Sequence, residues 1–215
     1  MVLTLYGSPY TTCTKRVAVV LKEKNIPYTF VPIDLMKGEH KSPEFLKKQP
    51  FGQVPCIDDD GFQLYESRAI GRYLAAKYAD QGTALLPTEL KARALFEQAA
   101  SVETANFDSK AYDLVAETVF KKMMTGLDAD EAKVTQFNAT LGGKLDAYEV
   151  ILSKQKYVAG TEITLADLFH LPLAPMVKDI SPELISSRPH VARWLEGLQA
   201  RPSWIAVEEE FNSGK

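Results

Sequence analysis

Glu66 and Ser67 carry side chains suited to a peptide-like ligand, at the point where a short strand is expected to end and a helix to begin. The Ser67 hydroxyl and the free N–H groups of a helix N-terminus can bind a carboxylate, and Glu66 can hold an ammonium group. Upstream, Pro55 has no N–H for a strand ladder, so the backbone of Val54 can face a ligand if their peptide bond is cis. The simpler alternative is that Ser67 caps the helix and Glu66 complements its dipole.

A second group of reactive side chains, Thr11, Thr12 and Cys13, lies where the first strand is expected to give way to the first helix. Either threonine can cap that helix through its hydroxyl. A cysteine in a first helical turn can have a lowered pKa and act as a nucleophile or redox centre. The alternative is that Cys13 is a small buried residue, and Cys56 on a later strand is expected in the core.

The elements that must position these residues follow from the pattern of the first half. A β-prone run at 2–6, a helical pattern from Thr14 and a second β-prone run at 28–33 predict a strand–helix–strand unit. Such a unit implies parallel strands and a right-handed crossover. Ser42 followed by Pro43 predicts the start of a short helix. The remaining strands should form a hairpin through a tight Asp-Gly turn, and their expected ranges are 54–57 and 62–65.

The second half shows only helical patterns. The segment 79–88 contains Gly82 and Pro87 and is expected to be a linker. Thr164 and Asp167 have the spacing of a capping box at a helix start. The predicted helices span about 90–119, 130–153, 165–177 and 191–200.

Composition excludes several classes of protein. A hydrophobic content of 46% with 25% charged residues is ordinary for a soluble globular chain. The net charge of −3 argues against nucleic acid as a partner. There is no apolar run long enough to cross a bilayer and no signal-peptide pattern. Two cysteines cannot form a disulfide framework, and no residue spacing suggests a metal site, so we expect a cytoplasmic protein without metal.

Three segments resemble those of a known family. QPFGQVP and YESRAI resemble the segments with which glutathione transferases grip glutathione, and GTEITLAD resembles the folding motif of their helical domain. PYTTCTKR resembles a P-x-S-x-x-T-x-R-like segment of the phi class, with Thr11 on the serine position. The resemblance implies a thioredoxin-like α/β domain (βαβ–ββα) at 1–80 that binds glutathione. It also implies an all-helical domain at 89–215 that contributes the electrophile site.

The resemblance further implies roles for individual residues. The hydroxyl of Thr11, or alternatively that of Thr12, donates a hydrogen bond to the sulfur of glutathione and favours its thiolate. The residues implied to bind glutathione are His40, Lys41, Gln53, Val54, Pro55, Glu66 and Ser67. The expected walls of the electrophile site are Tyr10, Leu35, Met36, Phe107, Ala111 and Val119. Phe51 resembles a residue that inserts into a partner subunit, which implies a homodimer.

The expected protein is therefore a transferase for detoxification that conjugates glutathione, its co-substrate, to hydrophobic electrophiles. The same thiolate can reduce organic hydroperoxides, which is a peroxidase activity. One alternative is a thiol-disulfide reductase that uses Cys13, although such relatives carry their cysteine on the serine position, two residues earlier. The other alternative is a non-catalytic ligand carrier, since a fold can persist where the function has changed. Neither nucleic acid nor a membrane is expected as a partner.

Overall fold

The computed structural model describes residues 2–212, which form two compact units. The N-terminal unit comprises the residues up to Leu86 together with the segment from Arg201, and the helical unit comprises Pro87–Ala200. This division differs from the expected ranges 1–80 and 89–215 chiefly at the C-terminal end. The last helix packs on the first helix of the N-terminal unit and belongs to that unit.

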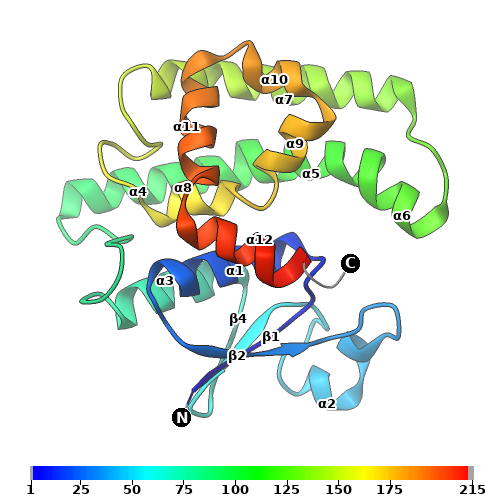
Figure 1. The fold of residues 1–215 in the computed structure, drawn as a ribbon, viewed down its shortest axis with the longest axis vertical. Helices are drawn as coiled ribbons and strands as arrows, with labels where there is room; N and C mark the ends of the chain where they lie inside the picture. The colour runs from blue at the N-terminus through cyan, green and yellow to red at the C-terminus, as the bar shows by residue number, and fades with distance from the viewer. Residues whose placement is uncertain (1, 213–215) are drawn as a thin grey trace. The chain divides into compact units, whose positions relative to one another are not determined.

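A four-stranded sheet organises the N-terminal unit (Figure 1). Its strand order is β2-β1-β3-β4, with β1 parallel to β2 and antiparallel to β3, and β3 antiparallel to β4. The expected βαβ–ββα order of a thioredoxin-like fold is therefore confirmed. The strands are β1 Leu3–Gly7, β2 Tyr28–Pro32, β3 Cys56–Asp59 and β4 Phe62–Tyr65.

The β3–β4 hairpin turns through only two residues. Asp60 and Gly61 have φ angles of 56° and 86°, and two positive φ values in succession suit the twist of a tight hairpin. The strand before the turn has the expected length of four residues but lies two residues later, at Cys56–Asp59, and so ends on Asp59. Its buried carboxylate accepts hydrogen bonds from the Tyr73 hydroxyl at 2.6 Å and from the Lys77 ammonium.

Helix α1 (Thr12–Glu23) lies beside α3 (Ser67–Lys77), and α12 (Pro202–Asn212) packs on α1 (Figure 1). An uninterrupted buried run at 17–21, VAVVL, anchors α1 to the core of the unit. The short helix α2 (Pro43–Leu46) starts as expected, because the Ser42 hydroxyl accepts a hydrogen bond from the Phe45 N–H at 3.2 Å. The turn before α2 is a short 3-10 helix, η1 (Glu39–Lys41).

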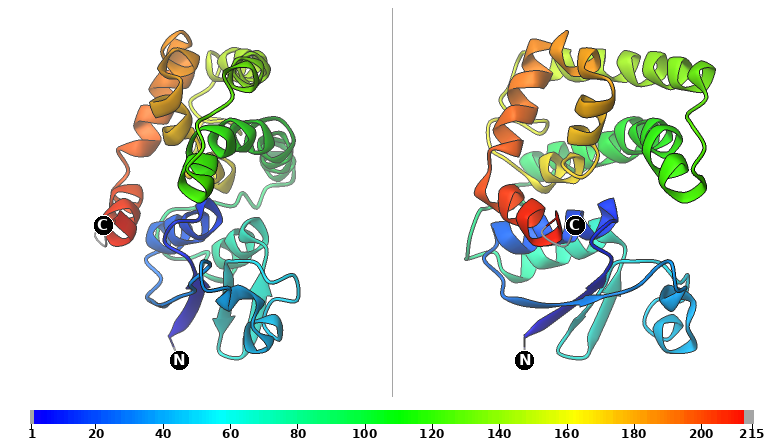
Figure 2. Two further views of the ribbon diagram at one scale, coloured as in Figure 1. Left: turned by 90° about the vertical axis from the view of Figure 1, so that its right-hand side faces the viewer. Right: turned by 45° about the vertical axis from the view of Figure 1, so that its right-hand side comes forward.

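The helical unit has one long helical run whose α-helical hydrogen bonding is interrupted twice, and α7 lies alongside this run (Figures 1 and 2). Two π-helical stretches, η2 and η3, separate its α-helical parts. The expected helix at 165–177 is broken, because Pro172 and Pro175 cannot donate backbone hydrogen bonds. The elements are α4 Leu90–Val102, η2 Glu103–Asp108, α5 Ser109–Val115, η3 Ala116–Phe120, α6 Lys121–Thr125, α7 Glu131–Leu152, α8 Leu165–His170, α9 Ala174–Ile180, α10 Pro182–Ser186 and α11 Pro189–Gln199.

The expected capping box at the start of α8 is present. The fully buried Asp167 carboxylate accepts from the Thr164 N–H at 2.9 Å, and also from the Val158 N–H at 2.9 Å and the Trp194 indole N–H at 3.0 Å. Burial raises the pKa of Asp167 above its ordinary value, against the lowering effect of these donors. One carboxylate thus joins α8, the preceding loop and α11. Within residues 2–212, no helix is long and apolar enough to cross a membrane.

Glu23, at the end of α1, holds the C-terminal segment on the N-terminal unit. Its buried carboxylate accepts from Arg201 Nη2 at 2.8 Å, Ser203 Oγ at 2.5 Å and Thr83 Oγ1 at 2.6 Å. Burial by itself raises the pKa of Glu23, but hydrogen bonds from Arg201, Ser203 and Thr83 outweigh it and hold the pKa below its ordinary value. Helix α12, which follows Arg201, was not among the elements predicted from the sequence. Its position depends on the contact between Arg201 and Glu23, which are far apart in the chain.

Replacing Glu23 by glutamine should lower the free energy of unfolding by about 1–3 kcal/mol at about pH 7, because hydrogen bonds to a charged group are lost. The folded-state pKa is depressed, so this contribution is complete above the ordinary value of 4.5 and disappears as the pH falls through the folded-state pKa. Urea unfolding at about pH 7 and about pH 3 measures it, with exposed Glu44→Gln as the control. A Glu23→Gln deficit of equal size at both pH values would contradict this account.

Candidate functional site

The candidate site residues of the N-terminal unit come from segments that meet at one end of the sheet. Tyr6 at the end of β1 pairs with Cys56 at the start of β3, and Cys56 pairs with Tyr65 at the end of β4. The segments beyond these positions, which lead into α1 and α3, therefore leave the sheet at the same end. The register of the strands is what brings the two helix N-termini to the proline turn before β3.

Thr11 is the N-cap of α1, with extended backbone angles φ −95° and ψ 133°. Its Oγ1 accepts from the Thr14 N–H at 3.4 Å, donates to the Ser8 carbonyl oxygen at 3.1 Å and lies 2.6 Å from Thr14 Oγ1. Its side chain is half-buried. Thr11 therefore caps α1, and its hydroxyl lies at the positive end of that helix.

Thr12 and Cys13 occupy the first turn of α1 and are both half-buried. The hydroxyl of Thr12 has no hydrogen-bond partner within the described part of the chain. Cys13 Sγ lies 3.5 Å from Arg16 Nη1, which donates to it. The expectation of a buried Cys13 is wrong, because the start of α1 is less covered than its middle. Cys56 is buried as expected, and burial raises the pKa of its thiol to about 11.

Arg16 connects the two helix N-termini. It is only 1% exposed, and its Nη1 donates to the Ser67 hydroxyl at 3.2 Å. Ser67 is the first residue of α3 and is itself buried. Because Arg16 can only donate, the Ser67 oxygen accepts from it, and the Ser67 hydroxyl keeps its own proton to donate. The expected carboxylate site at Ser67 thus has a cation directly behind it.

Glu66 and Pro55 give the other side of this junction an unusual backbone. Glu66 has φ 72° and ψ 106°, backbone angles that residues other than glycine rarely adopt, and its side chain is exposed. The Val54–Pro55 peptide bond is cis, which meets the condition under which the Val54 backbone was expected to face a ligand. Strained backbone angles such as those of Glu66 cluster at ligand-binding sites.

His40, Lys41 and Gln53 are brought together by the loop before the cis proline. Gly52 has φ 60°, and a Cβ atom there would lie 2.7 Å from both the His40 carbonyl oxygen and Lys41 Cδ. Lys41 Nζ donates to the Phe51 carbonyl oxygen at 3.0 Å. Among the described residues, His40 Nδ1 is the buried side-chain polar atom that lacks a hydrogen-bond partner. Gln53 has an exposed side chain, and its N–H donates to Gln49 Oε1 at 3.3 Å.

The six residues expected to line an electrophile site differ widely in exposure. In the N-terminal unit, Tyr10 and Met36 are exposed and Leu35 is half-buried. In the helical unit, Val119 is half-buried, but Phe107 and Ala111 are fully buried. The Phe107 ring packs on Tyr148 and His170 with centroid distances of 6.2 and 4.7 Å. Phe107 and Ala111 are therefore core residues of the helical unit. The sequence could not show this, because residues of a core and residues of a site wall follow the same helical spacing.

Both halves of the chain match models of one family. Residues 1–76 match the glutathione S-transferase N-terminal domain, and residues 111–202 match the glutathione S-transferase C-terminal domain. Glutathione S-transferase PM239X14 of Arabidopsis thaliana is 52% identical over 194 residues, which is 88% of each protein. The chain belongs to the glutathione S-transferase family.

Solved structures agree with this assignment. Glutathione transferase F7 from Populus trichocarpa has a TM-score of 0.93 and 38% identity, over 98% of this chain and 100% of that one. Glutathione S-transferase I from mais, solved with an atrazine glutathione conjugate, has a TM-score of 0.92 and 31% identity over 100% of both chains. The F-type relatives confirm the phi-like resemblance, and the expected fold of an α/β thioredoxin-like domain followed by helices is confirmed as well.

The sequence matched Thr14 and Arg16 to the threonine and arginine of the phi-class segment, but it predicted no role for either of these buried polar residues. Both lie in the stretch that resembles the phi-class segment, directly before the apolar run of α1. A threonine and an arginine on such a buried helix face need hydrogen-bond partners. Their presence beside an apolar run was the sequence feature that could have indicated a polar network there. Their partners, Thr11 and Ser67, were visible only in the structure. No group of three or more histidine, cysteine and carboxylate side chains able to hold a metal occurs within residues 2–212.

Replacing Glu66 by glycine should raise the free energy of unfolding by about 1 kcal/mol, because relief of the strained backbone outweighs the extra flexibility of glycine in the unfolded chain. Glu66→Gln keeps the strain and removes only the charge, so its stability should be unchanged. Both variants should weaken glutathione binding if the carboxylate contacts the ligand. Urea unfolding and titration calorimetry measure the two effects, and a Glu66→Gly variant that is less stable than Glu66→Gln would refute the strain.

Proposed function

We propose that this transferase activates the thiol of glutathione through the hydroxyl of Thr11, for attack on hydrophobic electrophiles. The observation that carries the proposal is the position of that hydroxyl at the N-terminus of α1, which leaves the sheet at the same end as the cis-proline turn and the start of α3. A free thiol is mostly protonated near neutral pH. A hydrogen bond to the sulfur and the positive end of a helix both favour the thiolate.

The other site residues would hold the tripeptide by its charged ends. Ser67 with Arg16 behind it suits a carboxylate at the start of α3, and Glu66 suits the ammonium group beside it. The Val54 backbone before the cis Pro55 suits the peptide portion. His40, Lys41 and Gln53 suit the second carboxylate, and the buried unpartnered Nδ1 of His40 supports a polar ligand there. The thiolate sulfur would then form a bond to an electrophilic carbon while a leaving group departs with its electron pair.

Thr11→Ala should return the pKa of the enzyme-bound glutathione thiol most of the way to its free value, because the alanine has no donor for the sulfur. Thiolate absorbance measured against pH gives this pKa, and turnover of a generic aryl halide should fall by roughly 10- to 100-fold. Cys13→Ser is the matched control on the same helical turn and should keep both properties. Bound glutathione with an unshifted pKa in the wild type would favour a ligand carrier. A shift that survives Thr11→Ala would assign the stabilisation of the thiolate to Thr12 or to the N-terminus of α1 itself.

A reductase that uses Cys13 is the second candidate, because Cys13 is half-buried in the first turn of α1 and its Sγ accepts a hydrogen bond from Arg16 Nη1. Loss of disulfide reduction in Cys13→Ser, with conjugation retained, would establish that activity. Hydroperoxide reduction is a further candidate that uses the same glutathione thiolate. In it the sulfur attacks the peroxide oxygen, an alcohol leaves, and a second glutathione yields the disulfide and water. We also propose a reducing, cytoplasmic location, which the free thiols of Cys13 and Cys56 support.

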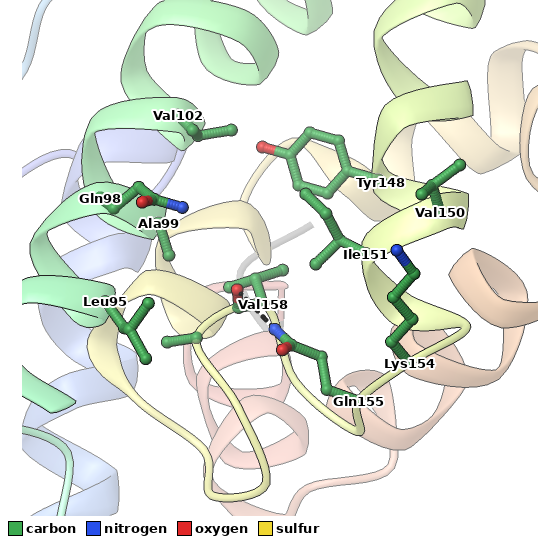
Figure 3. A pocket seen from close by; sticks show the side chains of 11 residues that line it. Leu95, Gln98, Ala99, Val102, Tyr148, Val150, Ile151, Lys154, Gln155 and Val158 are labelled. Carbon is green, nitrogen blue, oxygen red and sulfur yellow. Dashed lines mark hydrogen bonds between the residues drawn. The ribbon is translucent and has the colours of Figure 1, made fainter. Parts of the chain in front are cut away.

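We further propose that the chain forms a homodimer through Phe51. This ring is 64% exposed in the N-terminal unit. The helical unit has a pocket of about 210 Å³ between α4, α7 and the loop after α7 (Figure 3). An apolar cavity of about 150 Å³ is enough for a benzene ring, so the pocket can accept the Phe51 ring of a second copy. Its apolar walls include Leu95, Ala99, Val102, Tyr148, Ile151 and Val158.

Phe51→Ser should weaken dimerisation by roughly 30-fold or more, since an aromatic anchor is removed. Ala99→Phe should have the same effect from the opposite side, because it fills the pocket. Sedimentation equilibrium measures the mass against the chain mass of 23.9 kDa. Phe62→Ser, which removes another exposed ring, should stay dimeric. If both Phe51→Ser and Ala99→Phe remain dimers, the subunits meet through a different surface.

A further inference from the structure

Four groups at the start of α1 form a closed hydrogen-bonded network. The Ser8 N–H donates to Thr14 Oγ1 at 3.2 Å, Thr14 Oγ1 lies 2.6 Å from Thr11 Oγ1, and Thr11 Oγ1 donates to the Ser8 carbonyl oxygen at 3.1 Å. Thr14 is fully buried, and its approach needs a glycine at position 7. A Cβ atom on Gly7 would lie 2.6 Å from Thr14 Cγ2 and 2.7 Å from Thr14 Oγ1.

The protons of this network can be assigned from the acceptors. The carbonyl oxygen of Ser8 can only accept, so the Thr11 hydroxyl points its proton at Ser8. The proton of the buried Thr14 hydroxyl has one acceptor in the described structure, which is Thr11 Oγ1. Thr14 therefore donates and Thr11 accepts in their 2.6 Å contact.

We infer that Thr14 is a positioning residue that makes the Thr11 hydroxyl an obligate donor and thereby selects the thiolate form of bound glutathione. The inference rests on the proposed function of Thr11. A hydroxyl oxygen has two acceptor positions. Thr14 fills both of them on Thr11, one with its hydroxyl at 2.6 Å and one with its backbone N–H at 3.4 Å. The Thr11 hydroxyl can therefore make only one further hydrogen bond, in which it donates its own proton.

This saturation has a chemical consequence for a sulfur placed against Thr11. A hydroxyl with an open lone pair can accept a hydrogen bond from a neutral S–H, and that contact stabilises the thiol. A hydroxyl whose lone pairs are both occupied can only donate, and a donated bond favours the thiolate. Donation from Thr14 also polarises the Thr11 O–H bond, since hydrogen bonds in a chain strengthen one another.

The Thr11 proton can leave the Ser8 carbonyl without exposing an unpaired acceptor. That carbonyl oxygen also accepts from the Thr11 backbone N–H at 3.1 Å. When the proton turns to the sulfur, the carbonyl keeps this partner, and Thr14 keeps both of its bonds to Thr11. The network thus changes one bond on ligand binding and leaves no buried group unsatisfied.

The test is the pKa of enzyme-bound glutathione in four variants, measured by thiolate absorbance, with calorimetry to confirm that each variant binds. Thr14→Val, which keeps the shape and loses the hydroxyl, should raise the bound thiol pKa by roughly 0.5–1 unit. Thr14→Ser, which keeps the hydroxyl and loses the methyl group, should stay close to the wild type. In the Thr11→Ala background, adding Thr14→Val should change nothing, because Thr14 acts through Thr11.

Each other outcome overturns the inference in a distinct way. If Thr14→Ser by itself raises the pKa by the roughly 0.5–1 unit expected of Thr14→Val, packing of the methyl group is what matters, and this result can be obtained even if Thr14→Val does not fold. If Thr14→Val has no effect while Thr11→Ala still abolishes the shift, the proposed function stands and the role of Thr14 falls. If Thr14→Val still raises the pKa in the Thr11→Ala background, Thr14 does not act through Thr11. If the wild type shows no lowered pKa, both proposals fail together.

Discussion

The hydrogen-bond register of the four-stranded sheet is the constraint on which the candidate site depends. With Tyr6 opposite Cys56 and Cys56 opposite Tyr65, the segments that lead into α1, β3 and α3 share one end of the sheet. A slip of one residue would turn every side chain of a strand to the other face. The buried face of the sheet forbids such a slip, so packing far from the site fixes the geometry within it.

Burial of polar groups is the second organising requirement. Thr14 and Arg16 enter the covered face of α1, where a polar group without a partner would destabilise the fold. Their partners, Thr11 and Ser67, are the residues at the starts of α1 and α3. The interactions that satisfy these buried polar groups therefore also hold the hydroxyl groups of Thr11 and Ser67 in place. In this transferase, the same hydrogen bonds contribute to the stability of the fold and fix the positions of the candidate site residues Thr11 and Ser67.

Single carboxylates join distant parts of each unit. Glu23 fixes the returning C-terminal segment on the N-terminal unit, and Asp167 joins α8 to the preceding loop and to α11. Their environments differ, and so do their titrations. Donors hold the pKa of Glu23 below its ordinary value, whereas burial dominates at Asp167 and raises the pKa. Protonation of Glu23 in acid should thus weaken the attachment of the C-terminal helix. The Asp167 carboxylate is fully buried, and the N–H groups of Val158, Thr164 and Trp194 donate to it.

The sequence by itself determined the order of the strands and helices in its first 80 residues, the hairpin turn, the capping box of α8 and the family. These depend on local periodicity, on turn and cap residues, and on short motifs. It did not reveal that Phe107 is core, that Cys13 is half-buried, that α12 returns to the N-terminal unit or that Glu66 has a positive φ. Each of these depends on contacts between residues far apart in the chain or on backbone angles that no residue type announces. Helical spacing shows that a face is apolar, but only the tertiary structure decides what covers it.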